Sequence, residues 1–143
     1  MFKIILMLLV CVQLMFAIDF KETRYLYAID KSIDFEGSIT FLKESIKITY
    51  IKPKQESIVY TQNDAIKQKK LFFMILEAIH SDDETLLGEF FEIKKDKNIV
   101  TLRPLELAKE YIKKVEYEKQ KDRLIFIEIF MQNNDRIKIE TIR

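Results

Sequence analysis

The sequence predicts a mainly β protein of the α+β class, in which a strongly curved antiparallel sheet carries a short helical segment on its concave face. Three observations predict it. Apolar and polar residues alternate with a period of two through most of the chain, one central interval is apolar without alternation, and one late strand is apolar on both faces. Period-two alternation is typical of strands with one buried face, whereas an unbroken apolar interval suits a helix.

Alternation defines the predicted strands. It is strictest at residues 33–41, where every odd position is apolar or Gly, and it continues through Ile46, Ile48 and Tyr50. Pro53 ends that strand, because proline has no backbone N–H to donate to a ladder. Further strands are predicted at residues 57–61, 90–94, 98–102, 111–119, 123–131 and 136–142.

Residues 71–79 (Leu-Phe-Phe-Met-Ile-Leu-Glu-Ala-Ile) predict a helix that is apolar over most of its circumference. A helix lying on a sheet needs an apolar stripe only about 100° wide. The excess indicates either a helix wrapped by its own sheet, which composition favours, or a helix that offers apolar residues to a second surface. Residues 81–84 (Ser-Asp-Asp-Glu) resemble a capping box that opens a second short helix, and Gly88 is its expected end.

The predicted strand at residues 124–131 is apolar on both faces, and Glu128 is its only charge. An antiparallel strand in a small sheet usually keeps one face in water. Two covered faces therefore predict either a sheet curled around a core or a strand at a dimer contact.

The N-terminal segment predicts export. Lys3 is followed by an apolar run at residues 4–16 and by the small residue Ala17, which is the pattern of a secretory signal peptide. The run is shorter than the roughly 20 residues of a membrane-spanning helix. We expect a signal peptide at residues 1–17 and one mature domain at residues 18–143. Lipidation at Cys11 and an uncleaved anchor are the alternatives.

Composition excludes several function classes. The 143 residues carry a net charge of +1, whereas phosphate binding needs a surplus of Lys and Arg, so nucleic acid is not an expected partner. One His and one Cys leave little material for metal or thiol chemistry, and the common phosphate, dinucleotide and zinc motifs are missing. No catalytic residue, metal or cofactor is expected, and His80 is predicted to cap the C-terminal end of its helix.

Several segments, in their order and spacing, resemble one known family. Residues 20–24 and 35–41 are similar to its opening strands, with an apolar-x-Gly-x-apolar signature. Residues 46–53 are similar to its Arg-Trp-x-Tyr-x-x-Pro segment, with Lys47 and Ile48 at the Arg and Trp positions. The central helix, the next strand and a Leu-x-Pro segment have counterparts at residues 71–79, 86–87, 90–93 and 100–104. The chain thus resembles a short, divergent member of the LolA-type periplasmic lipoprotein carriers.

This resemblance implies a fold, a location and partners. The family fold is an incomplete antiparallel β-barrel with a helical lid, and its hydrophobic cavity accepts lipoprotein acyl chains on their way to the outer membrane. It implies a periplasmic, monomeric protein that meets an inner-membrane exporter and an outer-membrane acceptor. The family Arg helps to regulate ligand uptake and the closed lid, and the resemblance places Lys47 at its position.

The expected function is a periplasmic carrier or chaperone that binds acyl chains of lipoproteins or other lipids. The alternative is a non-transporting interaction module for a membrane lipid exporter or a partner protein. Which strand face lines the cavity depends on register, because a shift of one residue exchanges the two faces. The predicted lipid-binding residues are Phe35, Ile39, Phe41, Ile46, Ile48, Tyr50, Phe72, Phe73, Leu76, Phe126 and Phe130.

Overall fold

The computed structural model describes residues 17–142, which form one open antiparallel sheet and two α-helices. The predicted signal peptide covers residues 1–17. Residues 1–16 lie outside the described part of the chain, and Ala17 is the first residue of β1. The strands are β1 (Ala17–Leu26), β2 (Lys31–Phe41), β3 (Ser45–Lys52), β4 (Glu56–Thr61), β5 (Phe91–Asp96), β6 (Ile99–Pro104), β7 (Ile112–Gln120), β8 (Arg123–Met131) and β9 (Arg136–Thr141). The helices are α2 (Lys67–His80) and α3 (Glu84–Phe90), with short 3₁₀ turns at η1 (Tyr27–Ile29) and η2 (Ala108–Glu110).

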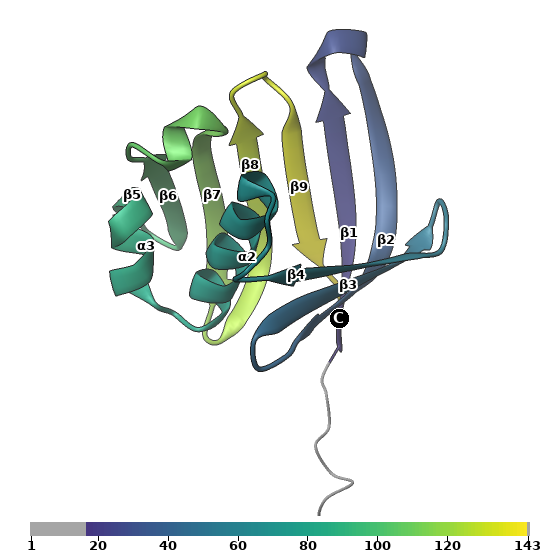
Figure 1. The fold of residues 1–143 in the computed structure, drawn as a ribbon, viewed down its shortest axis with the longest axis horizontal. Helices are drawn as coiled ribbons and strands as arrows, with labels where there is room; N and C mark the ends of the chain where they lie inside the picture. The colour runs from purple at the N-terminus through teal and green to yellow at the C-terminus, as the bar shows by residue number, and fades with distance from the viewer. Residues whose placement is uncertain (1–16, 143) are drawn as a thin grey trace, which may run out of the picture.

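The strand order is β4-β3-β2-β1-β9-β8-β7-β6-β5, so β4 and β5 are the two free edges. Every neighbouring pair is antiparallel, and β1 pairs with β9 at the centre of the sheet. The chain therefore has to pass from one edge to the other between β4 and β5. It does so through α2 and α3, and α2 crosses the inner face of the sheet on the way (Figure 1).

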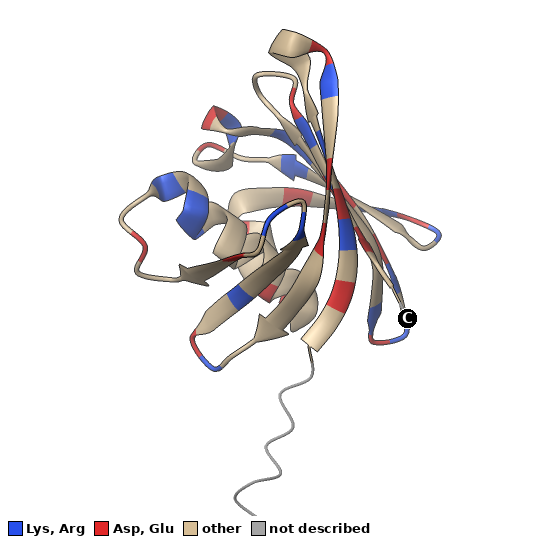
Figure 2. Ribbon diagram, turned by 90° about the vertical axis from the view of Figure 1, so that its right-hand side faces the viewer, with Lys and Arg blue, Asp and Glu red and all other residues tan. Residues whose placement is uncertain are grey.

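The sheet bends sharply where β2 and β3 pair. The register of this pair shifts between Glu36 and Gly37, as at a β-bulge. A Cβ atom on Gly37 would lie 2.3 Å from the carbonyl oxygen of Thr49, so only glycine allows the two backbones to come this close. Bulges increase local twist. The bend carries β3 and β4 over toward α2, which thus lies inside the curve of the sheet (Figure 2).

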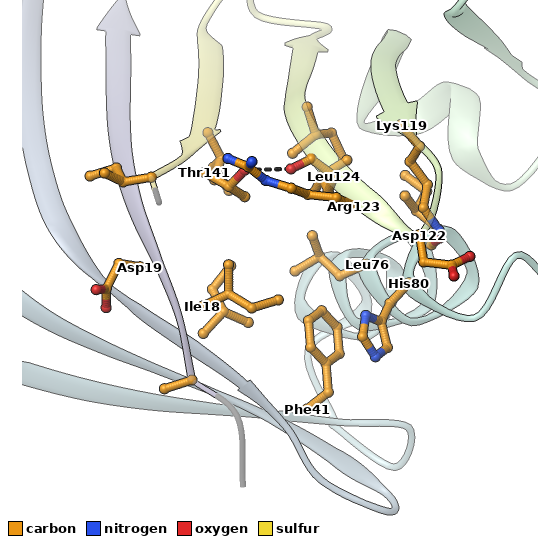
Figure 3. A pocket seen from close by; sticks show the side chains of 16 residues that line it. Ile18, Asp19, Phe41, Leu76, His80, Lys119, Asp122, Arg123, Leu124 and Thr141 are labelled. Atoms are coloured by element: carbon orange, nitrogen blue, oxygen red, sulfur yellow. Dashed lines mark hydrogen bonds between the residues drawn. The ribbon is translucent and has the colours of Figure 1, made fainter.

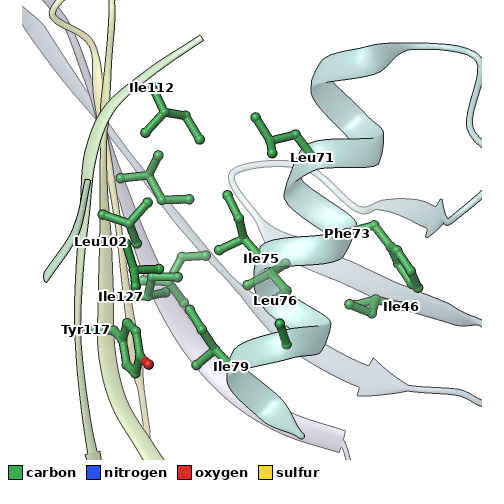
Figure 4. Packing of buried hydrophobic residues seen from close by; sticks show 14 of the residues in the cluster. Ile46, Leu71, Phe73, Ile75, Leu76, Ile79, Leu102, Ile112, Tyr117 and Ile127 are labelled. Carbon is green, nitrogen blue, oxygen red and sulfur yellow. The ribbon is translucent and has the colours of Figure 1, made fainter. Parts of the chain in front are cut away.

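The core surrounds α2, as the wrapped-helix interpretation predicts. Leu71 and Ile79 of the helix face Leu102 and Ile127 on one side, while Phe73 faces Ile46 on the other (Figure 4). All of these side chains are at most 8 % exposed. Most of the apolar residues of α2 are thus buried between the two halves of one curved sheet.

The predicted strands all have counterparts in the sheet, and β8 has the predicted bounds. The first strand, β1, was expected only from the family resemblance. Its inward positions alternate as in the other strands, but two of them are the charged residues Glu22 and Arg24. These charges conceal the alternation in the sequence. None of the helices formed by residues 17–142 has the length and apolar content needed to cross a membrane.

The predicted capping box is wrong in detail. Asp83, not Ser81, is the N-cap of α3, and its side chain accepts a hydrogen bond of 3.0 Å from the backbone N–H of Leu86. Ser81 belongs to the end of α2, where its hydroxyl donates to the carbonyl of Glu77 at 2.7 Å. Gly88 does not end α3 either. A terminating glycine usually adopts positive φ, whereas Gly88 has no positive φ and lies inside the helix.

Candidate functional site

A cavity of about 420 Å³ lies between the C-terminal end of α2 and strands β1, β2, β8 and β9 (Figure 3). We call it the main cavity. Its wall is mostly apolar and includes Ile39, Phe41, Leu76, Ile127 and Ile139. The volume lies within the range of about 300 to 1,000 Å³ that is usual for small-molecule sites. The size and the lining together suit an apolar ligand.

Strand alternation places these side chains in the wall. Ile18 and Ile39 are paired across β1 and β2, and Ile127 and Ile139 are paired across β8 and β9. Directly paired residues of antiparallel strands point to the same face. Both pairs therefore project toward α2, where Leu76 closes the space from the helix side.

An aromatic stack stands at the edge of the main cavity. The rings of Phe41 and His80 lie nearly parallel, with centroids 3.7 Å apart and an interplanar angle of 4°. Burial lowers the pKa of His80 and outweighs the opposing effect of the Glu77 carboxylate. The neutral ring is therefore favoured. His80 thus fastens the last turn of α2 to β2 by packing.

Lys119 holds the C-terminal end of α2 to β7. Its ammonium group donates to the carbonyl oxygen of Ile79 at 2.8 Å and pairs with Asp82 at 2.7 Å. The side chain of Lys119 is only 11 % exposed. Lys119, rather than the predicted His80, therefore provides the cation that satisfies a terminal carbonyl of this helix.

A second cavity of about 290 Å³ lies along the N-terminal half of α2. Leu71 and Met74 of the helix line it together with Leu107 and Tyr111 from the segment around η2. Lys67 and Lys70 of α2 also border it. The helix thus has an apolar hollow near each of its ends, and the main cavity is the larger.

A buried polar network lies on the inner face of the sheet. Glu22 is 3 % exposed, and its carboxylate accepts a hydrogen bond of 2.5 Å from Nε of Arg24. The Tyr50 hydroxyl accepts from Nη2 of Arg24 at 2.9 Å and donates to Glu22 at 3.2 Å. The guanidinium of Arg24 also lies 4.2 Å from the ring centroid of Phe35. Burial raises the pKa of Tyr50, so this hydroxyl keeps its proton and remains a donor.

The sequence predicts Tyr50 and Phe35 as site residues but does not predict Glu22 and Arg24. The available signal was the spacing of Phe20, Glu22 and Arg24, which follow one another at every second position. In a strand this spacing puts the three side chains on one face. The network therefore joins β1 and β3 through hydrogen bonds, and the Arg24–Phe35 contact connects it to β2.

Nine of the eleven predicted lipid-binding residues lie in three environments. Ile39, Phe41 and Leu76 line the main cavity. Phe35 and Phe72 are partly buried against the core. The remaining inward-facing residues are buried in the core, and they are Ile46, Ile48, Tyr50 and Phe73.

The predicted cavity positions of Phe126 and Phe130 are wrong. Alternation along β8 puts Ile127 and its odd-numbered neighbours inward, so both phenylalanines lie on the outer face of the sheet. Each is covered there by a lysine: the Lys138 ammonium lies 5.3 Å from the Phe126 ring centroid, and that of Lys114 lies 4.6 Å from the ring of Phe130. Lysine stems cover apolar surface while their charges stay in water. This explains a strand that is apolar on both faces without a second core.

Lys47, which the resemblance places at the family Arg position, lies on the outer face of the sheet. Lys47 is exposed on β3 between buried Ile46 and Ile48. Adjacent residues of a strand point to opposite faces, so Lys47 points away from α2 and from the main cavity. The inward cation of this part of the sheet is Arg24 instead.

No protein-family model matches the chain, and no curated protein matches it. The resemblance to LolA-type carriers therefore stays a prediction.

Among residues 17–142, no group of three or more potential metal-ligating side chains comes together.

Proposed function

We propose that the protein is a periplasmic lipid carrier that shields an acyl chain in the main cavity. The apolar hollow between α2 and the sheet is the observation that carries this proposal. Each buried methylene gains about 0.8 kcal/mol over its state in water. A chain of lipid length therefore does not cross an aqueous compartment unaided, and an apolar cavity of this kind supplies the shelter.

In this proposal the curved sheet acts as an incomplete barrel and α2 as its lid. The last turn of α2 covers the main cavity, buries Ala78 and Ile79 in the core, and is further attached to the sheet by the His80–Phe41 stack and by Lys119. All of these contacts lie at one end of one helix. A modest outward movement of that turn would widen the cavity for loading and release.

The resemblance to LolA-type carriers and the expected signal peptide support the proposed location and partners. The donor would be an inner-membrane exporter and the acceptor an outer-membrane component. The cargo would be a lipoprotein acyl chain or another lipid, and the carrier would act as a monomer.

A second candidate is a non-transporting interaction module. Exposed apolar side chains favour it: Tyr27 and Ile29 at the β1–β2 turn are 57 % and 58 % exposed, and Leu107 is 74 % exposed. Such residues suit contact with a partner protein or exporter. This candidate requires no ligand in the main cavity, which makes ligand binding the deciding observation.

The test is a titration of the delipidated protein with a fluorescent fatty-acid probe, using two matched tryptophan variants. Leu124 lines the main cavity, whereas Phe126 lies on the outer face of the same strand. These two residues face opposite sides because the β7–β8 register shifts between the Glu118–Phe126 and Lys119–Leu124 pairs, as at a β-bulge. Leu124→Trp fills the cavity and should weaken saturable binding by at least about tenfold, or 1.4 kcal/mol. Phe126→Trp should leave binding unchanged. Circular dichroism checks that both variants keep the sheet.

Absence of saturable binding by the parent protein would contradict the carrier and favour the interaction module. Equal binding by the parent and Leu124→Trp would place the probe outside the main cavity.

A further inference from the structure

The size of the main cavity limits how much ligand it can hold. Its volume of about 420 Å³ lies near the lower end of the range of about 300 to 1,000 Å³ that is usual for small-molecule sites. One acyl chain suits this size, whereas two or three chains together need a larger enclosed space.

The polar groups near the main cavity are unevenly placed. Asp19 belongs to the exposed alternate positions of β1, so its carboxylate points away from the inner face. Asp122 lies beside Lys119 and His80, at the end of α2 (Figure 3). Arg123 lies across the opposite side of the opening, next to Thr141, above the apolar wall.

Arg123 is the cation at this opening whose charge is not engaged by the protein. Lys119 is committed to Asp82 and to the carbonyl of Ile79. None of the ion pairs formed within residues 17–142 includes Arg123. A guanidinium group offers a planar set of donors that matches carboxylate and phosphate oxygens.

From these observations we infer that the main cavity takes a single-chain amphiphile whose anionic end binds Arg123. The inference rests on the proposed function and narrows it to one class of ligand. The chain lies along Leu76, Ile127 and Ile139, and its carboxylate or phosphate accepts hydrogen bonds from the guanidinium. The ligand class is therefore a fatty-acid-like or monoalkyl-phosphate-like anion, rather than a lipid that needs all of its chains enclosed.

The experiment compares ligands of one chain length and different end groups. Tetradecanoate, tetradecyl phosphate, tetradecanol and tetradecyltrimethylammonium are titrated against the purified protein by displacement of a fluorescent fatty-acid probe, each below its micellar concentration. We expect at least one anion to bind about tenfold more tightly than the alcohol, as one charge-assisted hydrogen-bonded contact supplies. The cation should bind more weakly than the alcohol. Comparing the two anions identifies the end group.

Arg123→Gln should remove the preference for the anion while leaving the affinity for tetradecanol within about twofold of the parent, because it removes the charge and leaves the apolar wall intact. Arg123→Lys should keep part of the preference. The matched control is Arg103→Gln, which changes an exposed arginine on β6 and should alter neither affinity. Because Arg123 starts a strand at the protein surface, these variants should remain folded, as circular dichroism would verify.

Equal affinity of the parent for anions and alcohol would overturn the inference and leave the lipid-carrier proposal standing. An anion preference that survives in Arg123→Gln would overturn it in the same way. Failure of all four ligands to bind would overturn both.

Discussion

The two glycines of the chain occupy opposite environments. At Gly37 the β2 backbone comes so close to β3 that an added Cβ would lie 2.3 Å from a carbonyl oxygen of Thr49 and 3.1 Å from Cα of Tyr50. Backbone atoms cannot move aside as a flexible side chain can. At Gly88, inside α3, an added Cβ would meet no atom within 4 Å. One glycine is thus required by the bend of the sheet, and the other is a replaceable helix residue.

We predict that Gly37→Ala lowers the free energy of unfolding by about 2 kcal/mol or more, because the sheet must open to admit the methyl group. Gly88→Ala should raise it by about 0.5 to 1 kcal/mol, because alanine loses less backbone entropy in a helix. Urea unfolding followed by circular dichroism measures both. Equal stability of the two variants would contradict the proposed origin of the bend.

Residue patterns show why the site was predicted only in part. The inward positions of β2 and α2 follow from alternation and helical spacing, and Ile39, Phe41 and Leu76 do line the main cavity. Phe126 and Phe130 were misplaced because β8 is apolar at both parities, so composition does not reveal its inward face. Glu22 and Arg24 were missed because only the folded sheet brings Tyr50 to them.

At the scale of elements, α2 packs against both halves of the sheet (Figure 4). Its middle is deeply packed, since Phe73 is 6 % and Ile75 is 1 % exposed. Its C-terminal turn buries Ala78 and Ile79 in the core and is further attached by Lys119 and the His80–Phe41 stack. The helix and most strands could be predicted from period and composition. Composition favoured a helix wrapped by its own sheet, but it could not show which strands would pack on each side of the helix.

We predict that Lys119→Met lowers the free energy of unfolding by about 1 kcal/mol, since it removes a hydrogen bond to a helix carbonyl and an ion pair with exposed Asp82. Hydrogen exchange should accelerate at amides of the last turn of α2 and remain slow in its middle. Lys94→Met, a change at an exposed position of β5, is the control and should alter stability by less than about 0.5 kcal/mol. Unchanged exchange at the helix end would show that Lys119 does not hold it.

At the scale of the whole molecule, the topology places the movable element over the cavity. The sheet is open, and its two edges are joined only by the segment that contains α2 and α3. A shift of α2 therefore need not break any strand pairing, because the helix lies between the edges rather than within the ladder. Basic and acidic residues are interspersed along the strands (Figure 2).

The central claim is that the space between the end of α2 and β8 and β9 receives an acyl chain. A crystal structure of the protein with tetradecanoate tests it most directly. We predict one continuous chain of density along Leu76, Ile127 and Ile139. Density confined to the second cavity or to the outer surface, or a main cavity closed by its own side chains, would contradict the claim.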